Sequence, residues 1–319
     1  MTRVAAIDCG TNSIRLLIAD LDGPAARDVV REMRIVRLGE DLDRTAMLAP
    51  QALARTFAAC EAYADLIEQH GAERLRFCAT SAARDAGNAG EFTAGVRTRL
   101  GVDPEIVSGD EEARLSYAGA VLDFGAEDPF RNLVVDIGGG STEFVAGVGP
   151  EATEWDSVDV GSVRLTERHL HADPPTTDEI ARASRDIDRA LDSLSVDLRV
   201  GGIRRVGDSW DVGGNVVGVA GSITTIAAHT LGLSEYDSER IHLSRLAVDD
   251  VLASCDDMIH ARIAERRAMP FMHPGRADVI GGGALVLQRV LVRVAPALPE
   301  PYLLVSEHDI LDGIAWSLR

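Results

Sequence analysis

The chain has 319 residues, of which 46% are hydrophobic and 26% charged, so it is long enough for about two globular domains and is neither disordered nor fibrous. Its net charge of −19 argues against nucleic-acid binding, which depends on clustered positive charge. We expect a cytoplasmic protein with reduced cysteines, because there is no secretory or membrane-spanning pattern and the four cysteines lie far apart. All 32 basic residues are arginine, which excludes lysine-dependent phosphate chemistry.

The N-terminal residues predict a strand, a tight turn and a second strand. An apolar run at 4–7 leads into Asp8-Cys9-Gly10-Thr11-Asn12-Ser13, and a second apolar run follows at 14–18. Asp22-Gly23 is a strong hairpin signal before a third strand at 29–38. The opening is therefore predicted to be a three-stranded antiparallel meander.

A helix over 50–70 and a short strand over 75–79 are predicted next, from the three- to four-residue spacing of apolar residues and the Gly71 stop signal. The segment that follows carries hydroxyl groups and Arg84, which suit a phosphate at the end of a strand. A helix start capped by Ser81 explains the same residues without a ligand.

Three carboxylates, Asp110, Glu111 and Glu112, begin a helix predicted from 108 to about 124, after a short strand at 105–107. Carboxylates in a first helical turn stabilise the helix dipole whatever the function of the protein. Their position after a strand and shortly before a second glycine-rich turn favours a role in deprotonating a water molecule.

The second turn repeats the first. The apolar run Leu133 to Val135 reaches Asp136, passes three glycines and resumes at Thr142 and Glu143, so Asp-x-Gly-x-x-Ser recurs at an offset of 128 residues. Successive glycine N–H groups can approach an anionic oxygen, and a carboxylate beside them can hold a divalent cation. The duplication predicts two α/β lobes, 1–126 and 127–319, whose turns face each other across a cleft, with the final helix packing back on the first lobe.

The second half of the chain adds further turns. A strand at 216–220 ends in Gly221-Ser222, a favourable place for an anion at a helix N-terminus. Residues 278–284 predict a glycine-rich turn before a helix at 285–294, and a strand at 303–305 precedes a closing helix from 306 to 316. The histidines show no zinc-binding pattern, and we expect His308 to cap or pack.

With these segments together, the sequence resembles the exopolyphosphatase and guanosine pentaphosphate phosphatase family of the actin-like ATPase superfamily. The resemblance covers nearly the whole chain and implies two ribonuclease H-like lobes around an interdomain cleft. It also implies that Glu112 activates water, with Glu111 as the alternative, and that Asp136, Glu143 and Glu112 hold Mg²⁺ or Mn²⁺. The implied phosphate-binding residues are Asp8, Gly10, Thr11, Asn12, Ser13, Arg84, Gly138, Gly139, Gly140, Ser141, Thr142, Gly221 and Ser222.

The resemblance implies hydrolysis of the terminal phosphate of inorganic polyphosphate. Because the surface charge is negative, we expect short chains to be preferred. Hydrolysis of guanosine pentaphosphate is an alternative function, with guanosine pentaphosphate or tetraphosphate as the partner. A non-catalytic sensor of an alarmone or polyphosphate and a sugar or acetate-type kinase are further alternatives. No nucleic-acid or membrane partner is expected, and the oligomeric state is left open, a homodimer included.

Overall fold

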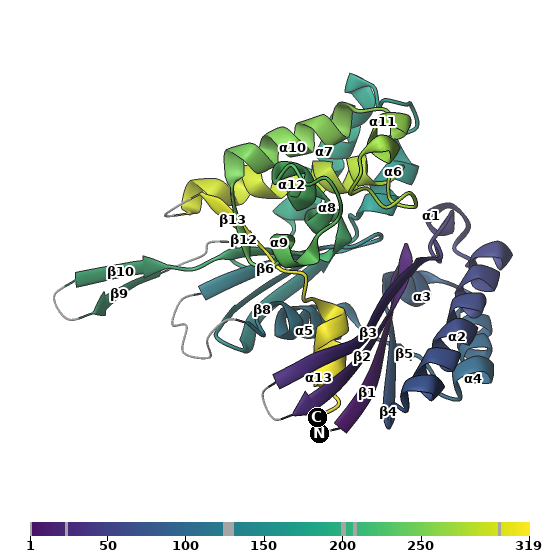
Figure 1. Cartoon of the computed structure of the whole chain (residues 1–319). Coiled ribbons are helices and arrows are strands. Elements are labelled where there is room, and N and C mark those ends of the chain that lie inside the picture. Colours follow the sequence, from purple (N-terminus) through teal and green to yellow (C-terminus); the bar gives the residue numbers. More distant parts are fainter. Residues whose placement is uncertain (1, 23–24, 124–130, 199–201, 207–208, 299–300) are drawn as a thin grey trace. The chain divides into compact units, whose positions relative to one another are not determined.

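The computed structural model describes residues 2–22, 25–123, 131–198, 202–206, 209–298 and 301–319. These residues form two compact units (Figure 1). Unit 1 comprises Met1–Gly119 and Ile310–Arg319, and unit 2 comprises Ala120–Asp309. The boundary predicted between residues 126 and 127 lies outside the described residues and stays a prediction.

Unit 1 is built on a five-stranded mixed sheet in the order β3-β2-β1-β4-β5. The first three strands form the predicted antiparallel meander, although Gly23 of the predicted hairpin turn lies outside the described residues. The next two strands run parallel to β1. The strands are β1 (Thr2–Cys9), β2 (Ser13–Asp22), β3 (Ala25–Ile35), β4 (Arg74–Ala79) and β5 (Glu105–Ile106).

Helices cover both faces of this sheet. Alternate residues of β1 point to opposite faces, so Ala5 and Ile7 pack with Tyr63 and Phe92, whereas the neighbouring side chains pack with the C-terminal helix. The helices are α1 (Leu42–Thr45), α2 (Pro50–His70), α3 (Ser81–Asp85), α4 (Ala89–Leu100), α5 (Gly109–Ala120) and α13 (Ile310–Trp316).

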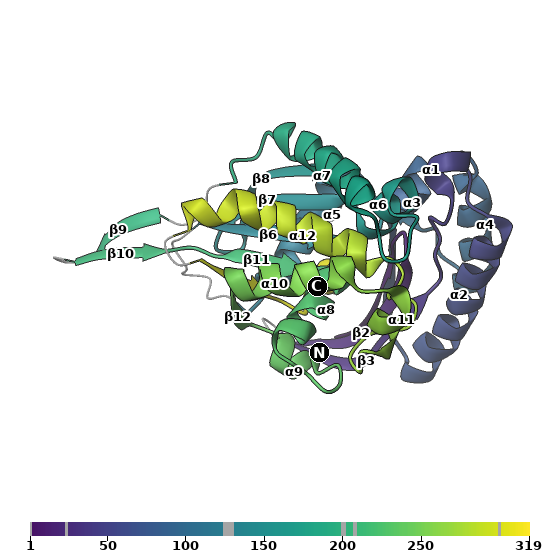
Figure 2. The ribbon, with the colours of Figure 1, turned by 90° about the horizontal axis from the view of Figure 1, so that it is seen from above.

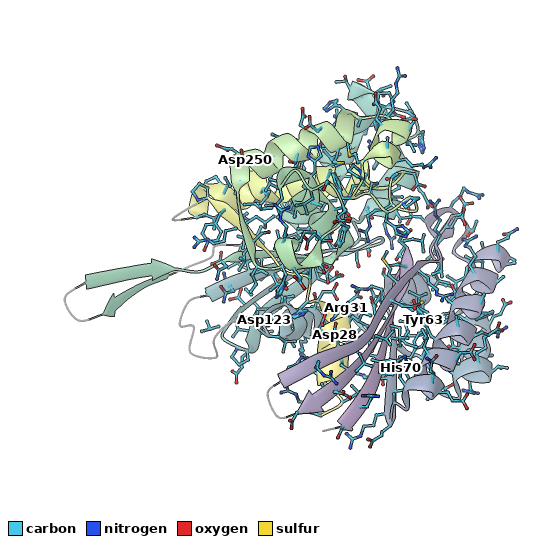
Figure 3. The ribbon with its side chains drawn as sticks, in the orientation of Figure 1. Asp28, Arg31, Tyr63, His70, Asp123 and Asp250 are labelled. Carbon is cyan, nitrogen blue, oxygen red and sulfur yellow. The ribbon has the colours of Figure 1, made fainter. Side chains whose placement is uncertain are left out.

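An ion pair between β3 and α13 also holds the C-terminal helix on the sheet of unit 1. Arg31 of β3, which lies close to Asp28 on the same strand (Figure 3), donates hydrogen bonds to the buried Asp312 of α13. The last ten residues therefore complete the second apolar layer of unit 1, although the rest of unit 1 lies at the other end of the sequence.

Unit 2 contains a six-stranded mixed sheet in the order β12-β13-β11-β6-β7-β8. Its antiparallel meander is followed by two strands parallel to β6, which repeats the strand order of unit 1, and an antiparallel edge strand is added. The strands are β6 (Arg131–Ile137), β7 (Thr142–Val148), β8 (Glu151–Val158), β11 (Val216–Val219), β12 (Ser244–Ala247) and β13 (Tyr302–Val305).

The apolar residues Leu133, Val135 and Phe144 of this sheet pack in one large core with the helices of unit 2. Figures 1 and 2 show α7, α10 and α12 layered over this face of the sheet. The helices are α6 (Ser162–His169), α7 (Thr177–Asp192), α8 (Ala220–Thr230), α9 (Ser238–Ile241), α10 (Val248–His260), α11 (Ile263–Ala268), α12 (Ile280–Val294) and the 3₁₀ turn η1 (Ala295–Ala297).

A separate two-stranded ribbon, β9 (Gly202–Val206) and β10 (Ser209–Gly213), extends from unit 2 in both views (Figures 1 and 2). No strand was predicted over these residues. The predicted α/β class with two related lobes is confirmed by the matching strand orders. None of the helices in the described part of the chain is long and apolar enough to cross a membrane.

One predicted turn is wrong. Residues 281–283 lie inside α12, which begins at Ile280, and do not form a glycine-rich turn before a helix at 285. A Cβ on Gly282 would lie 2.6 Å from the Ser162 carbonyl oxygen, and a Cβ on Gly283 would lie 2.6 Å from the Ser222 hydroxyl oxygen. These glycines therefore let α12 pack closely against the starts of α6 and α8.

Candidate active site

The first turn lies where β1 passes into β2. The Gly10 amide donates to the Ser13 carbonyl at 2.9 Å, and the Thr11 and Ser81 hydroxyl oxygens lie 2.9 Å apart. The carbonyl of Asn12 accepts from the amides of Val36 and Arg37. The turn is thus fixed by its own backbone, by the loop after β3 and by the start of α3, so it needs no ligand to hold its shape.

Asp8, predicted to help bind phosphate, is held by an arginine that the sequence analysis did not single out. Arg15 lies directly opposite Asp8 in the β1–β2 register, and its Nε and Nη2 atoms lie 3.0 and 2.6 Å from Asp8 Oδ2. A buried carboxylate needs such a partner. The strand–turn–strand register, counted from the turn, could have revealed this pair in advance.

The adjacent cysteine is not a candidate nucleophile. Cys9 is fully buried, and burial raises the pKa of its thiol well above the usual value, with smaller contributions from Cys60 and Asp8. Nucleophilic thiols need a lowered pKa and access to the ligand. This position therefore contributes packing to the turn.

The two candidate bases, Glu111 and Glu112, have different surroundings. Glu112 is 7% exposed, and its Oε2 accepts a hydrogen bond from Arg84 Nη1 at 3.0 Å. Glu111 has a side chain that is 39% exposed and pairs at 3.2 Å with Arg76, which also binds Glu105. Burial leaves Glu112 better suited to control a proton, because its charge is less screened by solvent.

Arg84 of α3 contacts both Glu112 of α5 and the segment that precedes α5. Its Nη1 also donates to the Val107 carbonyl at 3.0 Å, which anchors the guanidinium to the segment before α5. β4 and β5 run parallel, so α3 and α5 begin at the same edge of the sheet, next to the turn after β1. Unit 1 therefore brings the first turn, Arg84 and Glu112 together.

The second turn has the same backbone geometry as the first. The Gly138 amide donates to the Ser141 carbonyl at 3.1 Å, matching the bond of Gly10 to Ser13. The Thr142 hydroxyl, predicted to face phosphate, donates instead to the Val160 carbonyl at 2.6 Å. The repeat that the sequence predicts is thus preserved in hydrogen bonding, while the Thr142 hydroxyl proton is already used inside the unit.

The start of α6 is hydrogen-bonded to the carbonyl groups of this turn. The amides of Ser162 and Val163 donate to the carbonyls of Gly138 and Gly139 at 3.0 and 2.9 Å, and Arg164 Nε donates to the Gly140 carbonyl at 2.8 Å. A Cβ on Gly161 would lie 2.5 Å from the Gly139 oxygen. These contacts occupy carbonyl groups of the turn, and the Gly138 amide already donates to Ser141. The N–H groups that remain in the turn are therefore the candidates to bind an anion.

The predicted metal ligands of unit 2 are cross-strand neighbours. Asp136 lies opposite Glu143 in the β6–β7 register, so the two side chains share one face of the sheet. Both are buried, at 6% and 1% exposure, and Glu143 Oε1 accepts from the Ser157 hydroxyl at 2.8 Å. Two buried carboxylates side by side repel each other, and an oxygen-only donor set of this kind fits Mg²⁺ or Mn²⁺.

The Gly221-Ser222 segment starts α8 beside Asp136, because Val219 pairs with Asp136 in the parallel β11–β6 register. Ala220 has a φ of 67°, a left-handed conformation that non-glycine residues rarely adopt. Arg276 packs its guanidinium against Gly221 and donates to the Thr225 hydroxyl at 2.8 Å. This arginine adds positive charge at the predicted anion site, and no local pattern in the sequence indicated it.

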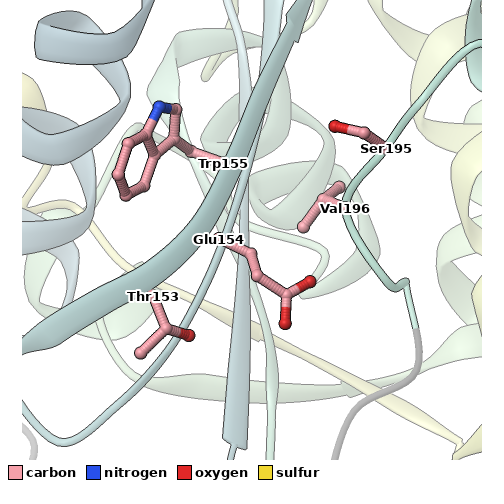
Figure 4. Close-up of a pocket in the computed structure, with 5 residues that line it drawn as sticks. All are labelled: Thr153, Glu154, Trp155, Ser195 and Val196. Atoms are coloured by element: carbon pink, nitrogen blue, oxygen red, sulfur yellow. The ribbon is translucent and has the colours of Figure 1, made fainter.

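A pocket elsewhere in unit 2 is separate from these residues. It is lined by Thr153, Glu154 and Trp155 of β8 and by Ser195 and Val196 after α7 (Figure 4). The Glu154 carboxylate already accepts from Arg131 and from the amide of Asp197. We therefore assign no catalytic role to this pocket.

Glycine turns can bind phosphate through their N–H groups, and paired carboxylates can hold a divalent cation, so these groups favour an enzyme that acts on a phosphate compound. The model of the Ppx/GppA phosphatase family matches residues 17–315, and the chain belongs to this family. It is accordingly a hydrolase of the phosphatase class.

Among similar proteins, exopolyphosphatase 2 of Mycobacterium tuberculosis is 47% identical over 332 residues, which span 100% of this chain and 99% of that protein. The crystal structure of an exopolyphosphatase-like protein is 42% identical, with a TM-score of 0.91 over 99% of this chain and 97% of that chain. A Ppx/GppA family member from Aquifex aeolicus is 28% identical, with a TM-score of 0.78 over 99% and 98%.

Proposed function

We propose that this protein is an exopolyphosphatase that removes the terminal phosphate from inorganic polyphosphate, with a preference for short chains. The observation that carries this proposal is the 47% identity, over the whole chain, to a protein named exopolyphosphatase 2. The buried Glu112, the two glycine turns and the paired carboxylates Asp136 and Glu143 supply the groups that such a reaction needs.

In this proposal Glu112 accepts a proton from the attacking water. Arg84 holds the carboxylate in place through Nη1 and is anchored by the Val107 carbonyl, so the base is oriented before substrate arrives. In each unit, the backbone N–H groups of the glycine turn would bind phosphate oxygens, apart from the amides of Gly10 and Gly138, which already donate within their turns. Donors placed in advance around a phosphoryl group stabilise the charge that develops on its oxygens during transfer.

Asp136 and Glu143 would hold the Mg²⁺ or Mn²⁺ ion that the family resemblance implies. When bound, such an ion neutralises charge on the phosphate oxygens and orients them. Asp8 is better placed to orient the first turn than to bind phosphate, since Arg15 occupies its carboxylate.

The preference for short chains follows from charge. Only local donors are available to the substrate in this proposal, and the chain as a whole carries −19. Each phosphate beyond the first few would meet a neutral or acidic surface, so added length should bring little binding energy.

The test is phosphate release in Mg²⁺, measured per chain end on polyphosphates of graded length, beside guanosine pentaphosphate and ATP. We expect kcat/KM to be highest for short polyphosphates. Faster phosphate release from guanosine pentaphosphate than from any polyphosphate would identify guanosine pentaphosphate as the preferred substrate instead. Tight binding of an alarmone without any turnover would instead favour a sensor, and transfer of phosphate from ATP to a sugar would favour a kinase.

A further inference from the structure

Three side chains that are distant in the sequence of unit 2 converge on one point. Asp123 follows α5 (labelled in Figure 3), His242 lies between α9 and β12, and His308 follows β13. One ligand atom from each lies within 4.8 Å of the others, and this is the one such group of three among the described residues. We propose that Asp123, His242 and His308 bind one divalent transition-metal ion of the zinc class.

The spacing suits such an ion. His242 Nε2 lies 3.3 Å from Asp123 Oδ2, and His308 Nδ1 lies 2.7 Å from the same oxygen. Tetrahedral zinc ligands at their usual bond lengths are about 3.3 Å apart. Of the three pairs of ligand atoms, the pair of His242 with Asp123 is already at this separation, and the pair of His308 with Asp123 needs to open by about 0.6 Å to admit an ion. The two histidine nitrogens lie within 4.8 Å of each other.

The donor set determines the class of metal. Two imidazole nitrogens and one carboxylate oxygen favour zinc, cobalt or nickel, whereas Mg²⁺ prefers oxygen ligands alone. The paired carboxylates Asp136 and Glu143 form the oxygen-only set of the same unit. The two groups should consequently select different ions.

The local backbone holds the two histidines in place. Leu243, next to His242, has a φ of 57°, a left-handed conformation that costs conformational energy in a branched residue. The Ser306 hydroxyl accepts from the His308 amide at 3.0 Å and donates to the His308 carbonyl at 2.9 Å. The imidazole rings of His242 and His308 lie with their centroids 4.5 Å apart.

Without metal, both rings direct a protonated nitrogen at Asp123. His242 Nδ1 accepts from the Glu307 amide at 3.2 Å, so its proton is on Nε2. When the ion binds Nε2, that proton moves to Nδ1 and the contact with the Glu307 amide has to lengthen; the proton of His308 likewise moves from Nδ1 to Nε2. Metal binding should therefore be visible at the Glu307 amide.

The location suggests what the ion would do. Asp123 comes just after the chain enters unit 2 at Ala120, and His308 comes just before the chain leaves it at Asp309. An ion bound to both, and to His242, would tie the entering and leaving segments to the β12 side of the sheet. We therefore assign it a structural role in unit 2.

The experiment is calorimetric titration of Zn²⁺ into full-length protein that has been stripped with EDTA and dialysed into saturating Mg²⁺. We expect one Zn²⁺ per chain. His308→Asn and His242→Gln keep a hydrogen-bond donor toward Asp123 but are poor ligands, so each should weaken binding at least about tenfold. His169→Asn is the matched control, because His169 pairs with Asp186 at 3.0 Å and belongs to no group of three ligands among the described residues, so its zinc binding should be unchanged.

Zinc binding that is the same in all four proteins would place the ion elsewhere and overturn the proposal. Absence of zinc uptake by the wild-type protein would overturn it too and leave a hydrogen-bonded cluster. If one variant fails to fold, the other variant still tests the site. The zinc-induced shift of the Glu307 amide resonance in the wild-type protein tests it independently. Because the measurement is metal uptake, its failure leaves the proposed phosphatase activity untouched.

Discussion

The two glycine turns have the same backbone and different chemistry. Each follows an Asp at a strand end and is closed by an amide-to-carbonyl bond, from Gly10 to Ser13 and from Gly138 to Ser141. The residue facing that Asp across the strand pair is Arg15 in unit 1 and Glu143 in unit 2. Because this equivalent position holds Arg15 in unit 1 and Glu143 in unit 2, the first turn is preceded by an Asp–Arg ion pair and the second by two neighbouring carboxylates.

This difference indicates a division of labour after duplication. A carboxylate bound to arginine has little affinity left for a metal ion, whereas two adjacent carboxylates attract one. We infer that unit 1 contributes the base, Glu112, and that unit 2 contributes the metal ligands. The predictions below test this division, starting with the largest expected effect.

Glu112→Gln should lower kcat by about two to four decades, the scale expected for loss of a general base. The amide oxygen can still accept the hydrogen bond from Arg84, so substrate binding should persist. Glu111→Gln should cost little, because Glu111 lies at the surface with Arg76. Steady-state phosphate release beside a binding titration checks both, and an inactive Glu111→Gln with an active Glu112→Gln would exchange their roles.

Asp136→Ala should abolish activity or raise the Mg²⁺ concentration needed for half-maximal activity, and EDTA should inactivate the wild-type protein. Asp8→Asn is the matched variant in unit 1. It should alter kcat/KM without changing the apparent Mg²⁺ affinity, since Asp8 is paired with Arg15. Mg²⁺ titrations of activity measure both variants. Equal shifts of the apparent Mg²⁺ affinity in the two variants would contradict the assignment of the metal ligands to unit 2.

Gly161→Ala should distort the second turn alone, because the added Cβ would lie 2.5 Å from the Gly139 oxygen. Backbone crowding of this kind costs about 1–3 kcal/mol and should lower kcat/KM as the turn shifts. Gly90→Ala is the control, since a Cβ there meets no atom within 4 Å and an exposed helical glycine gains up to about 1 kcal/mol on this change. Chemical unfolding and phosphate release measure both effects.

The smallest effect concerns pH. Arg3 and Arg27 lower the pKa of Asp20 in unit 1 to about 2, while the Thr176 amide and hydroxyl and the amides of His171 and Ala172 lower that of Glu179 in unit 2 to about 2. Both groups therefore stabilise the fold fully above the unfolded pKa of about 4, and this is lost as pH falls toward about 2.

Asp20→Asn and Glu179→Gln should each flatten the dependence of unfolding free energy on pH below about 4. Added salt should reduce the contribution of Asp20 more than that of Glu179, because ion pairs are screened while backbone hydrogen bonds are not. Urea unfolding at pH 3 and pH 7, with and without salt, measures the difference. If salt reduces the contributions of Asp20 and Glu179 to the unfolding free energy equally, ion pairing with the arginines does not account for the lowered pKa of Asp20.

The sequence by itself determined the repeated strand–turn–strand units and the helix Pro50–His70, whose bounds are as predicted. These features rest on local signals: alternating apolar residues, a proline at the first helical position and Gly71 in the left-handed conformation after the last. The sequence also singled out Asp136, near the end of a strand, and the carboxylates 110–112, shortly after one, as candidates, and their roles stay predictions.

Only the tertiary structure decided which side chains meet. Arg84 pairs with Glu112, and Arg276 packs on Gly221, through contacts between elements that are distant in the chain. Packing against α6 and α8 placed Gly282 and Gly283 inside a helix, although glycine-rich runs usually indicate a turn. The meeting of Asp123, His242 and His308 has the same origin, because side chains on separate loops are brought together by strand order and helix packing, which no local spacing encodes.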